Sequence, residues 1–97
     1  MAAYVMADIE VLDPERYREY TSQVLDTLQP YGGRFLVRGG ATEVLEGDRT
    51  PHRVVIIEFP SVEKVRDWYQ SPAYQKIVPI RTENSRSSLI LVEGTTP

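Results

Sequence analysis

Two arginines, Arg34 and Arg38, stand beside glycine pairs and are the side chains best suited to hold an anion. A guanidinium group presents paired N–H donors that match a carboxylate or an enolate, and glycine lets the backbone approach a ligand closely. The alternative is structural, since charges that become buried commonly find partners. The acids available for such pairs are Asp8, Glu10, Glu58 and Glu93. The pattern therefore predicts either an anion-binding site or ion pairs across a sheet.

His52 and Asp8 are the candidates for moving a proton. His52 is the only histidine of the chain, and histidine is the side chain whose ordinary pKa lies near neutral pH. It follows Thr50 and Pro51, so the alternative is a surface-loop residue without a chemical role.

The remaining candidates for substrate binding are aromatic or charged: Tyr4, Glu46, Trp68, Tyr69, Tyr74 and Arg81. Aromatic rings at helical spacing either wall a pocket or belong to the core. Glu46 lies in a turn, where it either does chemistry or pairs with Arg53 or Arg81. Arg81 either closes over a ligand as a lid residue or is a solvated arginine at a helix end.

Composition excludes several classes of protein. The chain has 97 residues with a net charge of -3 and no cysteine, so we expect no nucleic-acid or anionic membrane partner, no disulfide and no thiolate nucleophile. A single histidine does not make a usual zinc site and disfavours haem handling, so neither metal nor cofactor is expected. The first residues lack a basic segment, and the apolar runs are too short to span a bilayer. These features predict a soluble, cytoplasmic protein.

Local signals define the elements that must position these side chains. Strands are expected at residues 4–11, 34–38, 53–59 and 88–93, with a short extra strand around 42–45. Asp13 followed by Pro14 starts one helix and Ser61 starts a second, because each side chain caps a helix N-terminus. Ser71 with Pro72 starts a further helical segment over 73–83.

The two halves of the chain repeat one pattern. Ile9 to Tyr20 and Ile57 to Trp68 share strand residues, a capping residue and the first helical turns. Two such strand-helix-strand units interleave into a four-stranded antiparallel sheet with the helices on one face. We therefore predict an α+β, ferredoxin-like βαββαβ sandwich: one domain over residues 1–97, with its ordered core at about 4–93.

The second face of this sheet predicts a homodimer. Residues 54–57 and 89–92 are apolar at every position, which indicates cover on both faces of the sheet, and the chain has no element left to cover the second one. The residues expected to face the helices are Val5, Ile9, Phe35, Val37, Val55 and Ile57. Those expected on the dimer-facing side are Tyr4, Met6, Asp8, Arg34, Leu36, Arg38, Val54, Ile56, Glu58, Leu89 and Leu91. This side is mainly apolar with a few charges, as in pockets for small anionic or aromatic molecules.

Longer blocks of sequence carry a family resemblance. They are residues 32–40, from Gly32-Gly33-Arg34 onward, residues 45–47, residues 53–61, which include Glu58-Phe59-Pro60-Ser61, and residues 68–74. Together they resemble a family of small stand-alone bacterial proteins that carries only a domain-of-unknown-function label within the dimeric α+β barrel superfamily. The resemblance runs from about Tyr4 to Glu93. It implies a ferredoxin-like fold and a barrel formed by two sheets of a homodimer. Superfamily relatives include cofactor-free monooxygenases of antibiotic biosynthesis, muconolactone isomerases and haem-degrading enzymes.

Two functions remain open on this basis. The first is a small-molecule-binding homodimer that acts as a cofactor-independent enzyme of the oxygenase or isomerase type, with Arg34 and Arg38 holding an anionic group and His52 or Asp8 moving a proton. The second is a non-catalytic accessory or binding module, whose dimer interface consumes the apolar face and leaves no open pocket.

Overall fold

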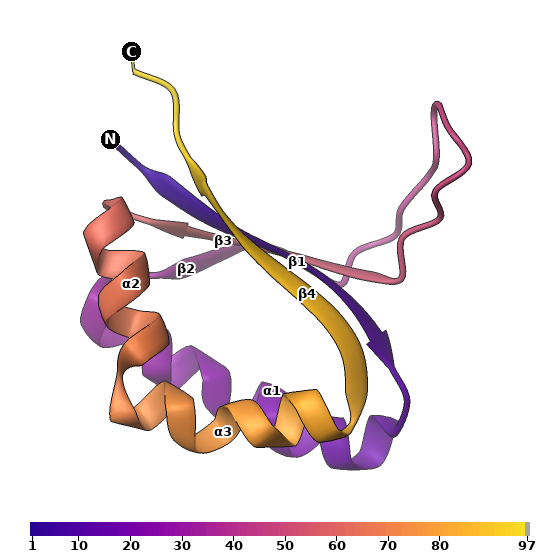
Figure 1. Ribbon diagram of the computed structural model, residues 1–97, viewed down its shortest axis with the longest axis horizontal. Coiled ribbons are helices and arrows are strands. Elements are labelled where there is room, and N and C mark those ends of the chain that lie inside the picture. The colour runs from indigo at the N-terminus through magenta and orange to yellow at the C-terminus, as the bar shows by residue number, and fades with distance from the viewer. Residues whose placement is uncertain (97) are drawn as a thin grey trace.

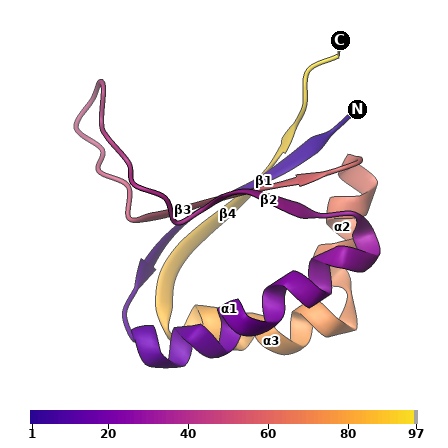
Figure 2. The same ribbon diagram turned by 180° about the vertical axis from the view of Figure 1, so that it is seen from behind.

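A single antiparallel sheet carries all the helices on one face in the computed structural model, which describes residues 1–96 (Figure 1, Figure 2). The sheet order is β2-β3-β1-β4. Along the chain the elements are β1 (Ala3–Val11), α1 (Pro14–Leu28), the 3-10 turn η1 (Gln29–Tyr31), β2 (Arg34–Arg38), β3 (Arg53–Phe59), α2 (Val62–Gln70), α3 (Pro72–Glu83) and β4 (Ser85–Glu93). The predicted ferredoxin-like α+β fold is confirmed.

Three side-chain caps determine where the helices begin. Asp13 accepts a hydrogen bond from the backbone N–H of Arg16 at 3.2 Å, and Ser61 accepts one from Lys64 at 3.2 Å. Ser71 has an extended backbone, so it ends α2, and its hydroxyl accepts from the N–H of Tyr74 to start α3. Each cap satisfies an N–H that the first helical turn leaves free. These are the starts that the sequence predicts.

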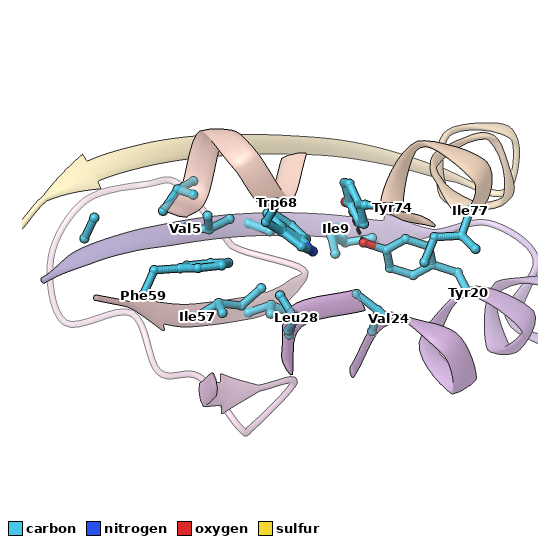
Figure 3. Packing of buried hydrophobic residues seen from close by; sticks show 14 of the residues in the cluster. Val5, Ile9, Tyr20, Val24, Leu28, Ile57, Phe59, Trp68, Tyr74 and Ile77 are labelled. Atoms are coloured by element: carbon cyan, nitrogen blue, oxygen red, sulfur yellow. Dashed lines mark hydrogen bonds between the residues drawn. The ribbon is translucent and has the colours of Figure 1, made fainter. Parts of the chain in front are cut away.

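Aromatic rings fill the core between the sheet and the helices (Figure 3). Trp68 is 1% exposed and packs on Tyr74 with ring centroids 4.0 Å apart. Its indole N–H donates to the hydroxyl of Thr27 at 3.0 Å, and the hydroxyls of Tyr20 and Tyr74 bond to each other at 2.8 Å. Buried polar atoms of aromatic rings therefore have partners, as burial requires.

The prediction for Leu89 and Leu91 was wrong. Leu89 lies opposite Ala7 and Leu91 opposite Val5, so both point to the helix face, because directly paired residues share a face. Ile90 lies on the open face instead, opposite Met6. A run that is apolar at every position shows no alternation, so the side chains of β4 that face the helices could not be predicted from the sequence.

A β-bulge overturns two further predictions. Arg34 pairs with Glu58, but the register shifts between Phe35 and Val37, so that Val37 lies opposite Ile56 and Arg38 opposite Val55. An extra residue in a strand reverses the alternation that follows it. Val37 therefore turns to the open face and Arg38 to the helix face, the reverse of what strict alternation predicts.

The connection between β2 and β3 contains no strand at residues 42–45, contrary to the prediction. Residues 41–50 are all exposed, and the segment projects from the end of the sheet, away from the helices (Figure 1, Figure 2). Within residues 1–96, none of the helices is both long and apolar enough to cross a bilayer.

Candidate functional site

A small cavity of about 30 Å³ lies on the helix face of the sheet, between β1, β3 and α1. Most of its wall is apolar, from residues such as Val5, Ile57 and Trp68. The polar side chains in the wall are Tyr17, Tyr20, Thr21, Arg38 and Arg53. An apolar lining with a few converging polar groups is the kind found in binding sites for small molecules, although such sites usually have a volume of roughly 300–1,000 Å³. The sequence predicts a pocket on the dimer-facing side instead, and an open hollow of about 540 Å³ lies there as well, with Met6, Asp8 and Ile90 in its wall.

Two grooves adjoin this cavity. An open groove of about 460 Å³ lies outside α1, and Tyr17, Thr21 and Arg53 line both the groove and the cavity, so they form its mouth. A second groove, the side groove, of about 230 Å³, lies between α2 and β4. Only Val5, Trp68 and Leu89 are common to its wall and that of the cavity. These three side chains therefore separate the cavity from the outside at its second flank.

The two arginines of the cavity wall have no carboxylate partner within residues 1–96. Arg38 donates from Nη2 to the backbone oxygen of Thr21 at 2.8 Å, and its guanidinium lies 4.3 Å from the ring centre of Phe35. Arg53 begins β3 opposite Ile9, and its buried Nε has no hydrogen-bond partner in the described chain. Both side chains bring positive charge to the cavity wall, and no carboxylate within residues 1–96 pairs with either of them.

A third arginine, Arg81, is buried behind the cavity. It is 5% exposed and donates from Nη1 to the hydroxyl of Ser87 at 2.6 Å, while its Nε has no partner among residues 1–96. The guanidinium lies 5.9 Å from the ring centre of Tyr20. Both sequence alternatives for Arg81 were therefore wrong, because it is neither a solvated helix end nor a lid but part of the interior, packed between α3 and β4.

The tyrosines beside these arginines are neutral at physiological pH. Burial raises the pKa of Tyr20, and the neighbouring Tyr74 raises it further. Burial also raises the pKa of Tyr17 and of Tyr74, although the charges of Arg53 and Arg81 oppose this at Tyr17 and that of Arg81 at Tyr74. Neutral hydroxyls are hydrogen-bond donors, so the positive charge of the arginines remains available to an anion.

Arg34 lies on the opposite, open face of the sheet. Its Nη2 is 2.6 Å from Oε1 of Glu58, and its Nε donates to the same oxygen at 2.8 Å. Tyr4 donates to the other oxygen of Glu58 at 3.3 Å. Arg34 thus forms the ion pair of the structural alternative, and the structure separates it from Arg38.

His52 and Asp8 come together, also on the open side. The backbone N–H of His52 donates to Oδ1 of Asp8 at 2.8 Å, and the imidazole lies 3.9 Å from Asp8 and 3.8 Å from Glu10. Neither residue belongs to the cavity wall. No group of three or more histidine, aspartate or glutamate side chains in residues 1–96 is arranged to hold a metal ion.

The other predicted residues divide between wall, core and surface. Trp68 belongs to the cavity wall, whereas Tyr74 is buried behind it in the bond with Tyr20. Tyr69 is partly exposed and lines the side groove. Glu46 lies in the exposed connection between β2 and β3, and forms no ion pair with Arg53 or Arg81.

Sequence reasoning did not select Tyr17, Tyr20 and Arg53 as site residues. A signal for them exists in the chain. The inward stripe of α1 carries tyrosines where aliphatic side chains suffice for packing. Arg53, Val55 and Ile57 are alternate residues of β3, and alternate residues of a strand share one face of the sheet. Because Val55 and Ile57 are buried against the helices, Arg53 is expected on the helix face as well.

The chain belongs to the family described as domain of unknown function DUF1330, which matches residues 2–95. Among curated proteins, none matches it significantly. It is similar to a solved protein of unknown function from Rhodopseudomonas palustris, RPA0582, with a TM-score of 0.78 and 21% identity over 99% of this chain and 84% of that one.

Two further solved structures share the fold at lower identity. SnoaB, a cofactor-independent oxygenase from Streptomyces nogalater, has a TM-score of 0.69 and 14% identity over 99% of this chain and 95% of its own. A dimeric ferredoxin-like protein of unknown function from Jannaschia sp. CCS1 has a TM-score of 0.69 and 15% identity over 97% of this chain and 100% of its own.

Proposed function

We propose that this member of the DUF1330 family is a homodimer that binds a small anionic or aromatic molecule in its interior cavity. We further propose that it acts on that molecule as a cofactor-independent enzyme of the oxygenase or isomerase type. One observation carries the proposal: Arg38 and Arg53 line the cavity without a carboxylate partner. Arg38 is exposed, but the buried Nε of Arg53 lies beside largely apolar side chains without a partner, and positive charge in such surroundings is costly unless an anion neutralises it. A bound anionic ligand supplies that partner.

The geometry favours chemistry on an oxyanion. Positive charge beside an enol or a phenol lowers its pKa, so such a substrate binds as the deprotonated anion. The wall contains neither a carboxylate nor a histidine, so the proton passes to solvent water at the mouth, beside Tyr17 and Arg53. The resulting anion is electron-rich at carbon, where it either reacts with oxygen or takes a proton back at another position. The shared fold of SnoaB, a cofactor-independent oxygenase, supports the first of these.

The dimer follows from the open face of the sheet. Met6, Ile56 and Ile90 lie there in adjacent strands, and Met6 and Ile90 are well exposed. An apolar sheet face of this kind is suited to a second copy in a closed two-fold arrangement. The dimeric protein from Jannaschia sp. CCS1 supports this assembly. The cytoplasmic location expected from composition forms part of the same proposal.

The volume of the cavity favours a second function. A cavity of about 30 Å³ has room for only about two water molecules, so an aromatic ligand enters only if the cavity opens toward the larger groove outside α1. A cavity that stays closed makes the chain a non-catalytic dimeric module.

Native mass spectrometry of freshly purified protein separates the two functions. A dimer that carries a defined additional mass, released on denaturation, supports the binding function and supplies the chemical class of the ligand. A dimer without any additional mass favours the non-catalytic module.

Titration with salicylate, a small aromatic anion, tests the role of the arginines directly. Trp68 is the only tryptophan and lies in the cavity wall, so its fluorescence reports binding. We expect Arg53→Gln to weaken binding about tenfold, since it removes a charge-assisted contact. Arg16→Gln is the control, because Arg16 is exposed on α1 and lines neither the cavity nor the groove at its mouth. Equal affinity of the wild type and Arg53→Gln would contradict the interior site.

A further inference from the structure

The open groove outside α1 is the part of the candidate site that has room for a ligand. Its volume is about 460 Å³, whereas the cavity that it adjoins has a volume of about 30 Å³. Binding sites for small molecules usually have a volume of roughly 300–1,000 Å³. Tyr17, Thr21 and Arg53 line both spaces. A ligand with one end at the cavity therefore has the rest of its length in the groove.

Helix and sheet both contribute to this groove. Pro14, Arg18 and Thr21 follow one another at steps of four and three residues, so they form a single stripe along α1. Val11 and Arg53 come from the adjacent ends of β1 and β3, on the helix face of the sheet. β1 ends where α1 begins, and the groove lies at this end of the fold (Figure 2).

The charge of the groove is positive, although the chain has a net charge of -3. Its wall contains Arg18 and Arg53 but no aspartate or glutamate. Neither arginine forms an ion pair within residues 1–96, whereas Arg16, two positions from Arg18 on the same helix, lies 3.8 Å from Asp13. Two cations without a neutralising acid attract an anion more strongly than a neutral molecule.

The two arginines of the groove differ in their surroundings. Arg53 is half-buried, its Nε has no partner in the described chain, and its guanidinium lies against the backbone of Gly39. It also belongs to the cavity wall, which Arg18 does not. Arg18 is exposed on α1 and borders only the groove. Arg53 is therefore suited to the inner end of a ligand, and Arg18 to a charge at its outer end.

We propose that the ligand is an elongated carboxylate, with a phenol or enol end at the cavity beside Arg53 and a carboxylate in the outer groove beside Arg18. The guanidinium of Arg18 presents paired N–H donors that match a carboxylate. Arg18 is then a specificity-determining residue, because it selects ligands by a charge that is remote from the reacting end. This inference rests on the proposed function, since the phenol or enol end occupies the interior site.

A matched pair of probes tests the remote carboxylate. Para-coumarate has a phenol at one end and a carboxylate at the other, and para-coumaramide has the same shape without the charge. By isothermal titration calorimetry we expect the wild type to bind the acid about fivefold more tightly than the amide, as for an exposed ion pair. Arg18→Gln should abolish this preference. It should leave the affinity for salicylate unchanged, because the carboxylate of salicylate is next to its hydroxyl and both stay at the cavity.

Arg16→Gln is the control for net charge. It removes one positive charge from the same helix, but Arg16 lines neither the cavity nor the open groove, so the preference for the acid should persist. An equal loss of preference in Arg16→Gln and Arg18→Gln would assign the effect to net charge and overturn the role of Arg18.

The remaining outcomes separate this inference from the function on which it rests. If the wild type binds salicylate but binds acid and amide equally, or if Arg18→Gln keeps the preference, the remote carboxylate site is overturned and the interior site stands. If the wild type binds none of the three probes, the interior site is overturned and this inference with it.

Discussion

Arg38 lies opposite Val55 in the sheet, whereas alternation from the pair of Arg34 and Glu58 places it opposite Val54. The register shift after Phe35 is the cause. It separates two arginines that look equivalent in sequence: Arg34 bonds to Glu58 on the open face, and Arg38 bonds to α1 on the helix face. The two side chains therefore lie on opposite faces of the sheet.

Alanine at these two positions should have opposite effects. Arg34→Ala leaves Glu58 without its partner on the face that we propose a second copy to cover, and we expect it to weaken the dimer about tenfold while salicylate binding stays unchanged. Arg38→Ala should weaken salicylate binding by a similar factor and leave the dimer intact. Analytical ultracentrifugation and the fluorescence titration measure the two effects. Loss of both properties in either variant would show that one surface serves both purposes.

Local signals in the sequence were sufficient to predict where the helices begin and where three of the strands lie. Asp13 with Pro14, and Ser71 with Pro72, act within one helical turn, so their effect is visible without knowledge of the fold. The face to which each β4 side chain points could not be predicted, because residues 89–92 are apolar at every position. Only pairing with β1 decides which of them face the helices.

The candidate site was harder to predict than the fold. The bulge that turns Arg38 inward arises in the pairing of β2 with β3, which no single segment encodes. Arg81 resembles an ordinary basic residue at a helix C-terminus, and its burial results from the packing of α3 against α1 and β4. Long-range contacts thus place Arg38 and Arg81 on the helix side of the sheet, which local sequence patterns do not show.

Gly39 should be required for the position of Arg53. It has φ of +74°, a region that disfavours other residues, and a Cβ there would fall on the guanidinium of Arg53. We expect Gly39→Ala to lower the free energy of unfolding by about 1–2 kcal/mol and to weaken salicylate binding as Arg53 moves. Gly40→Ala is the matched control, because its Cβ meets nothing within 4 Å. Urea denaturation and the fluorescence titration would refute this if both alanine variants behaved alike.

Thr27 should stabilise the core through a single hydrogen bond. Its hydroxyl accepts from the indole N–H of Trp68 at 3.0 Å in a buried position. Thr27→Val keeps the shape but leaves that N–H without a partner, so we expect a loss of about 1–3 kcal/mol in the free energy of unfolding. Thr27→Ser retains the hydroxyl and should lose less. Denaturant unfolding followed by Trp68 fluorescence gives both values, and a loss in Thr27→Val no larger than in Thr27→Ser would contradict the role of this hydrogen bond.

Alkaline pH should unfold the protein through its buried tyrosines. Burial raises the pKa of Tyr17, Tyr20 and Tyr74 in the folded chain above the ordinary value of 10.0, so folding favours the protonated hydroxyls. Their contribution to stability is complete below pH 10 and is lost as the pH rises toward the folded pKa values, by about 1.4 kcal/mol per pH unit for each tyrosine.

The double variant Tyr20→Phe with Tyr74→Phe tests this assignment. It removes both hydroxyls of the buried pair, so that no single hydroxyl is left without its partner. Two of the three titrating groups are then absent, and the free energy of unfolding should fall with pH at about one third of the wild-type slope above pH 10. Urea denaturation at a series of pH values measures both slopes. An unchanged slope would mean that other groups cause the alkaline unfolding, and that the hydroxyls beside Arg81 are not held in their protonated form by burial.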